Sequence, residues 1–212
     1  MCVPSFSNAK WRFSMPPLMT TLARRVVLPL LILLGVTLLV LGGGFLVIEY
    51  DGNIHTLVEG KAFRSAQLNE DELKHLVAQH GIRSILNLRG TSLGQPWYEK
   101  EVATADELGL VHIDYGISAN LPVSLEKMHR ILELLDKAPK PVLIHCKSGA
   151  DRTGLVSALY LAANGQSESR ARSELSVRYG HLPFFGVAGN TQAMDDSLDL
   201  FFRQRAVALT PK

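Results

Sequence analysis

The ten residues from His145 to Gly154, HCKSGADRTG, constrain the fold of this chain more than any other segment. The apolar run Pro141–Ile144 precedes them, and Leu155–Ala163 has the composition of a buried helix. A strand, a glycine-containing loop and a helix start therefore follow one another. Backbone N–H groups converge in such a loop, and the helix adds unpaired donors and the positive end of its dipole. The segment predicts an anion site that fits phosphate.

Two side chains of this loop add chemistry to anion binding. Cys146 stands at its start and Arg152 follows six positions later. A thiolate is a nucleophile, and a guanidinium is a planar, two-pronged donor that suits phosphate. Buried cysteines are commonly inert, but an inert cysteine would not normally be followed by a loop built for an anion. The pairing indicates thiol-dependent phosphatase chemistry.

The segment resembles the phosphate loop, Cys-x5-Arg-Ser/Thr, of the cysteine-dependent tyrosine and dual-specificity phosphatase superfamily, and is most similar to small bacterial members. The matching positions are His145, Cys146, Gly149, Arg152, Thr153 and Gly154. Weaker matches are FRSAQL at Phe63–Leu68 and ILNLRG at Ile85–Gly90. The resemblance runs from about Asn53 to the C-terminus and implies a dual-specificity-phosphatase-like fold.

The resemblance also implies a role for each loop residue. Cys146 attacks phosphorus to form a phosphocysteine, Arg152 holds two phosphate oxygens, and Thr153 favours the thiolate. His145 is expected to orient the loop backbone, and Gly149 to allow a positive φ or a close approach. The expected phosphate-binding residues are Lys147, Ser148, Gly149, Ala150, Asp151, Arg152 and Thr153.

The residue that protonates the leaving oxygen stays open between two aspartates. Many relatives supply an aspartate from a separate loop, and the corresponding segment here, DYGISANLP, contains only Asp114, close to a strand end. Asp151 lies beside Arg152, a placement similar to that in the lipid-directed myotubularin phosphatases. We favour Asp151. An aspartate there can instead cap the helix or pair with a cation, and both roles would make it a poor acid.

The rest of the chain predicts an α/β fold with a central, mainly parallel sheet flanked by helices. Asn69 and Gly81 are typical caps of a helix between them. Alternating strands and helices favour a parallel sheet covered on both faces, with the ligand at the carboxyl ends of the strands, where Cys146 falls. The expected helices are 69–80, 96–108, 122–137, 168–179 and 190–208, and the expected strands are 83–88, 110–113 and 141–144.

The segment Val26–Ile48 carries no charge over twenty-three residues, more than the roughly twenty that cross a bilayer as a helix. It predicts a transmembrane anchor, with a cleaved signal peptide as the alternative. Four basic residues precede it and Glu49 and Asp51 follow, which favours a cytoplasmic N-terminus. We therefore expect a disordered cytoplasmic tail (1–25), a single inner-membrane span (26–48) and a periplasmic catalytic domain (50–212).

Charge and cysteine content limit the partners, disulfides and cofactors that we expect. Four of the 22 Lys and Arg residues precede Tyr50, and so does one of the 20 Asp and Glu residues. The catalytic domain is therefore near neutral, and we expect no nucleic-acid partner. Cys2 and Cys146 would lie on opposite sides of the membrane and form no disulfide. No CxxC or HExxH motif occurs, so no metal or other cofactor is expected.

Three functions remain open at this point. The first is a phosphatase for phosphotyrosine or dual-specificity protein substrates, and the second is a lipid or inositol phosphate phosphatase. The third, from another class, is an inactive phosphate-binding sensor, against which the intact Cys146, Arg152 and Thr153 argue. The expected partners are thus a phosphorylated protein or lipid and the membrane, while the oligomeric state is left open.

Overall fold

The computed structural model describes residues 23–50, 52–182 and 190–209, without the side chains of residues 23–24, 40–41, 44–50 and 208–209. Most of the predicted tail and part of the segment between the last two predicted helices lie outside these residues. The chain divides into two compact units, with the boundary between Gly44 and Phe45.

The first unit contains a short π-helix, η1 (Ala23–Val27), and most of the helix α2 (Leu28–Tyr50). Residues 23–25, predicted as the end of a disordered tail, are thus helical. Within the described part of the chain, no helix has both the length and the hydropathy that a membrane crossing requires. The predicted span Val26–Ile48 is therefore not confirmed, and the side chains of 40–41 and 44–48 lie outside the description.

The second unit is built on a five-stranded sheet in the order β1-β2-β5-β3-β4. Its strands are β1 (His55–Val58), β2 (Ala62–Ser65), β3 (Ser84–Asn87), β4 (Val111–Asp114) and β5 (Val142–His145). Only β1 pairs antiparallel with its neighbour β2, and the other pairs are parallel. This confirms the predicted mainly parallel sheet and adds the β1–β2 hairpin, which was not predicted.

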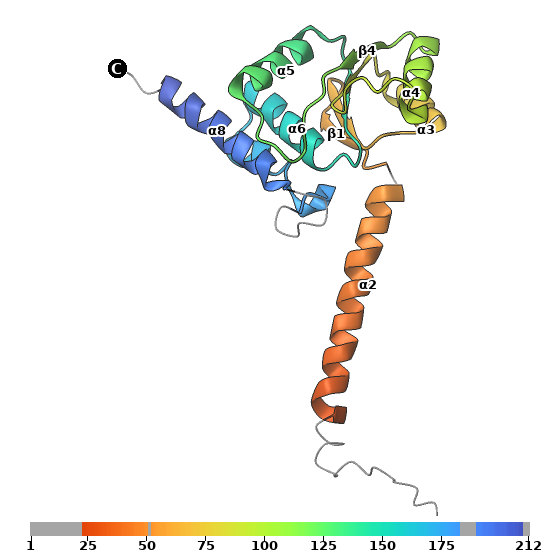
Figure 1. Ribbon diagram of the computed structural model, residues 1–212, viewed down its shortest axis with the longest axis vertical. Coiled ribbons are helices and arrows are strands. Elements are labelled where there is room, and N and C mark those ends of the chain that lie inside the picture. Colours follow the sequence, from red (N-terminus) through yellow and green to blue (C-terminus); the bar gives the residue numbers. More distant parts are fainter. Residues whose placement is uncertain (1–22, 51, 183–189, 210–212) are drawn as a thin grey trace, which may run out of the picture. The chain divides into compact units, whose positions relative to one another are not determined.

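Helices cover both faces of the sheet (Figure 1). α3 (Glu70–His80) and α4 (Pro96–Glu107) pack with the core that contains Leu143 of β5. α5 (Leu125–Lys137), α6 (Asp151–Ala163) and α8 (Gln192–Leu209) pack with the core that contains Val142 and Ile144. Successive residues of β5 thus enter opposite cores, as the alternation of side chains along a strand requires.

The helix predicted at 168–179 is interrupted. α7 (Glu168–Arg172) ends early, and a 3₁₀ turn, η2 (Val177–Tyr179), follows after four residues. Between them the carbonyl of Glu174 packs against α6, where a Cβ on Gly154 would lie 2.8 Å from its oxygen. The same carbonyl accepts a hydrogen bond from Arg64 at 3.0 Å. Residues 173–175 still donate turn hydrogen bonds to Ser169, Ala171 and Arg172, and the helical path breaks at Ser176, which is extended (φ −146°, ψ 162°).

Candidate active site

The phosphate loop lies at the carboxyl edge of the sheet, between β5 and α6. Cys146 is the first residue after β5 and is 1% exposed. α6 begins at Asp151 and is buried along most of its length. The predicted strand, loop and helix start are therefore all present. The buried thiol lies in this loop, beside the amino-terminal end of a buried helix.

Three consecutive carbonyls of the loop are held from outside. The oxygen of Lys147 accepts from the Gln67 N–H at 3.1 Å, that of Ser148 from Asn53 Nδ2 at 2.9 Å, and that of Gly149 from Arg64 Nη2 at 2.6 Å. Across a planar trans peptide the carbonyl and the next N–H point in opposite directions. The N–H groups of residues 148–150 are therefore turned away from these partners, into the loop, where they can bind an anion.

Gly149 is required by both its backbone and its neighbours. Its φ is +73°, in the left-handed region. A Cβ there would lie 2.7 Å from the nitrogen of Ala66 and 2.8 Å from the carbonyl of Ser65. These contacts are with backbone, which cannot move aside as a flexible side chain can. The close packing of the loop on the end of β2 thus excludes any larger residue.

Arg152 and Thr153 offer donors that no described residue uses. Arg152 Nη1 donates to the carbonyls of Leu88 at 3.3 Å and Ile117 at 3.5 Å, which fixes the side chain. Its Nε is buried and has no partner in the described part of the chain, and the same holds for Thr153 Oγ1. A buried donor without a partner costs free energy. Phosphate oxygens and the Cys146 thiolate are acceptors that would satisfy these donors.

Arg64 supports the loop from behind, in the role of structural partner to a carboxylate and carbonyls that the sequence favours over substrate contact. It is fully buried, forms an ion pair with Glu174, and its guanidinium carbon lies 3.8 Å from the centre of the Tyr179 ring. Burial lowers the pKa of Arg64, against the opposing effect of Glu174. The signal in the sequence was an arginine inside the strand segment AFRS. Its partner Glu174 is 110 residues away, so the pairing could not be read locally.

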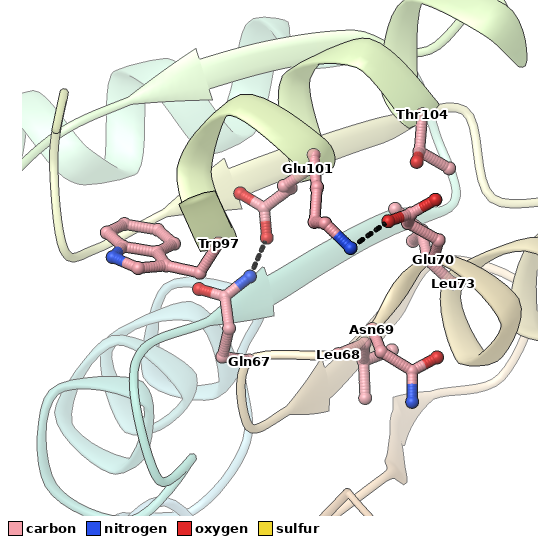
Figure 2. A pocket seen from close by; sticks show the side chains of 9 residues that line it. Gln67, Leu68, Asn69, Glu70, Leu73, Trp97, Glu101 and Thr104 are labelled. Carbon is pink, nitrogen blue, oxygen red and sulfur yellow. Dashed lines mark hydrogen bonds and ion pairs between the residues drawn. The ribbon is translucent and has the colours of Figure 1, made fainter. Parts of the chain in front are cut away.

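His145 contacts Glu101 through Nε2, and its Nδ1 lies 3.4 Å from the carbonyl oxygen of Cys146, the first residue of the loop. Its Nε2 lies 3.3 Å from Glu101 Oε1, which is also 2.9 Å from His112 Nε2. Gln67 donates to the other oxygen of Glu101, as Figure 2 shows. Burial alone would raise the pKa of Glu101, but the two histidines lower it to about 2. This buried carboxylate ties α4 to the last residue of β5.

Asp151, the favoured acid, is paired with a histidine. Its Oδ1 lies 2.7 Å from His181 Nδ1, and His181 Nε2 lies 2.9 Å from Asp195 Oδ2. His181 is 2% exposed. Burial by itself lowers the pKa of His181, but the bonds to Asp151 and Asp195 outweigh it and raise the pKa to about 9. His181 is therefore a cation at neutral pH, and it was not among the predicted site residues.

Asp114, the other candidate, has both oxygens engaged. Oδ1 accepts from Asn87 Nδ2 at 2.8 Å, and Oδ2 accepts from the Tyr98 hydroxyl at 2.5 Å and from Thr91 Oγ1 at 3.2 Å. It ends β4, two strands from β5. In contrast, only one oxygen of Asp151 is hydrogen-bonded to a described residue.

The described residues contain no group of three or more His, Cys, Asp or Glu side chains placed to hold a metal ion.

Solved structures share this fold at low sequence identity. Tk-PTP is 20% identical, with a TM-score of 0.55 over 73% of this chain and 97% of its own. TpbA from P. aeruginosa, solved with pTyr, is 19% identical, with a TM-score of 0.57 over 75% and 92%. The catalytic core of the PP-IP phosphatase SIW14 from S. cerevisiae is 19% identical, with a TM-score of 0.54 over 73% and 93%.

A search of curated protein sequences found no match. A family model, described as "Swiss Army Knife protein, DSP-PTPase phosphatase domain", matches residues 57–197, which include the whole phosphate loop and its supporting residues Arg64, Glu101, Glu174 and His181. The chain belongs to this PTP-SAK family and is a cysteine-dependent phosphatase.

Proposed function

We propose that this protein is a tyrosine or dual-specificity phosphatase, which hydrolyses phosphomonoesters through a phosphocysteine intermediate. The observation that carries the proposal is the loop itself, with a buried thiol, three N–H groups turned inward, and unused donors on Arg152 and Thr153. Such an arrangement stabilises the charge that spreads over phosphoryl oxygens in the transition state.

The reaction proceeds in two displacements. The Cys146 thiolate attacks phosphorus, the bond to the leaving oxygen breaks, and that oxygen takes a proton from an acid. Water then attacks the phosphocysteine, the sulfur–phosphorus bond breaks, and the same acid group takes back a proton. The products are an alcohol or phenol and inorganic phosphate, and the thiolate is regenerated.

We assign the acid to Asp151. It adjoins Arg152 in the loop and keeps one oxygen free of hydrogen bonds to described residues, whereas Asp114 has none free. The pairing with the His181 cation works against this role, because an aspartate bound to a cation is a poor acid, and the assignment therefore rests on the oxygen that His181 leaves free.

The test is phosphate release by the purified full chain from a phosphotyrosine peptide, a phosphoserine peptide and an anionic phospholipid. Cys146→Ser should abolish release, and Cys2→Ser, the matched control, should not change it. Faster release from the phospholipid than from either peptide would replace the protein-phosphatase proposal with the lipid phosphatase. Phosphate binding without release by folded wild-type protein would support the sensor.

We further propose that residues 26–48 anchor the chain in an inner membrane with the catalytic unit in the periplasm. The proposal rests on the uncharged sequence, the continuous helix α2, and the exposure of the apolar side chains from Val26 to Leu39. Carbonate-washed membranes should retain the full chain and release a variant that begins at Tyr50. Protease added to spheroplasts should degrade the catalytic unit; its protection would place that unit in the cytoplasm.

A further inference from the structure

Arg89 lies next to the phosphate loop although it belongs to another strand connection. Asn87, the last residue of β3, pairs in register with His145, the last residue of β5. The chain therefore leaves both strands at the same edge of the sheet, toward Leu88 and Arg89 in one case and Cys146 in the other. The carbonyl of Leu88 accepts a hydrogen bond from Arg152. Arg89 thus follows a residue that contacts the phosphate-binding arginine.

The guanidinium of Arg89 is held in place by two neighbours. Its central carbon lies 3.3 Å from the centre of the Trp97 ring, and its Nη1 donates to Gln67 Oε1 at 3.0 Å. Gln67 is itself fixed, because its N–H donates to Lys147 and its side chain to Glu101. Gln67 and Trp97 also line a cavity of about 290 Å³ between α3 and α4 (Figure 2). The Arg89 side chain is thus oriented before an anion binds, which lowers the entropy cost of anion binding.

Among the described residues the positive charge at this edge has no ion-pair partner, although Glu101 lies near enough to favour the charged form of Arg89. In the described part of the chain, no carboxylate lies within ion-pair distance of Arg89, Arg152 or the exposed Lys147. Burial, followed by the positive charge of Arg152, lowers the pKa of Arg89. Two arginines that repel each other beside an anion loop are stabilised when anions bind. The loop and Arg152 suffice for one phosphoryl group, which leaves Arg89 for a second anion.

We propose that Arg89, with added charge from Lys147, forms a second anion subsite, so that the preferred substrate carries another phosphoryl group close to the one removed. This inference rests on the phosphocysteine chemistry of the proposed function, and it favours the lipid or inositol phosphate alternative over a protein substrate. The second phosphoryl group can belong to a soluble polyphosphate ester or to a lipid headgroup, and the two share the same recognition chemistry.

The test compares three substrates with the full chain. p-Nitrophenyl phosphate has one phosphoryl group, inositol hexakisphosphate has soluble neighbouring groups, and phosphatidylinositol bisphosphate in phosphatidylcholine vesicles has them on a lipid. Arg89→Met should lower kcat/KM for at least one multiply phosphorylated substrate by about ten-fold more than for p-nitrophenyl phosphate, the size of one charge-assisted hydrogen bond. Which of the two responds distinguishes the soluble from the lipid source.

The matched control is Arg130→Met, which removes an exposed arginine of α5 that pairs with Glu133 at 2.9 Å and should change no substrate preference. Equal losses on all three substrates, or none, would overturn the subsite. A binding measurement tests it without altering Arg89: Cys146→Ser should bind inorganic pyrophosphate about ten-fold more tightly than orthophosphate, and equal affinities would refute it. If wild type releases no phosphate that depends on Cys146 from any substrate, the proposed function fails as well.

Discussion

His181 and Asp151 are joined by a contact of 2.7 Å that links the first residue of α6 to a segment thirty residues later. The other ring nitrogen of His181 reaches Asp195 of α8. A buried imidazolium between two carboxylates therefore connects the phosphate loop to the last helix. The pair also places a protonated group one hydrogen bond from the proposed acid.

The first prediction concerns stability against pH. The pKa of His181 is raised from 6.5 to about 9, so its stabilising effect is fully present below pH 6.5 and is lost as the pH rises through 9. His181→Asn should therefore lower the free energy of unfolding more at pH 6 than at pH 9.5, by roughly 2 kcal/mol. Denaturant unfolding at both pH values measures this. The exposed His129 provides the control His129→Asn, and a pH-independent deficit in the His181 variant would contradict the prediction.

The second prediction concerns the acid. Asp151→Asn should slow the hydrolysis of aryl phosphates with poor leaving groups by about 10² or more and affect good leaving groups much less, because only poor ones need the proton. The rate should therefore depend more steeply on leaving-group pKa. Asp195→Asn is the matched control, since it removes the other partner of His181 but should leave this slope unchanged. If Asp114→Asn steepens the slope and Asp151→Asn does not, the assignment is wrong.

Local sequence signals predicted the scaffold of the site well. The strand before Cys146, the helix after it, the caps Asn69 and Gly81, and the parallel sheet are all found. Each rests on residues close together in the chain. The partners of the loop's supports were missed because they pair over long separations, such as Asn53 with Ser148 and Arg64 with Glu174. The helix predicted at 168–179 is found only in part, as α7 and η2, because Ser176 between them is extended and the Glu174 carbonyl is held by Arg64.

The third prediction separates backbone strain from packing. Gly149 and Gly165 both have a positive φ, +73° and +80°, but only a Cβ at Gly149 would collide with backbone atoms. Gly165→Ala should cost about 1 kcal/mol of stability with normal activity. Gly149→Ala should cost more and lower kcat/KM by at least about ten-fold, because the loop must move off Ser65 and Ala66. Similar effects of the two substitutions would show that packing against β2 is unimportant.

The last prediction separates the two roles of Arg64, which neutralises Glu174 and holds the Gly149 carbonyl outward. Arg64→Met should lower the free energy of unfolding by about 3 kcal/mol, since it leaves the buried Glu174 carboxylate with the half-exposed Arg170 as its one ionic partner among the described residues. Adding Glu174→Gln removes that charge and should restore part of the stability.

Activity should not follow stability in this series. In the double variant the Gly149 carbonyl still lacks its donor, so the next peptide N–H is no longer held toward the anion, and kcat/KM should stay about ten-fold or more below wild type. Denaturant unfolding and phosphate release, measured on the same preparations, test both parts. Recovery of activity together with stability would show that Arg64 serves only the fold, and that the loop keeps its N–H groups in place without it.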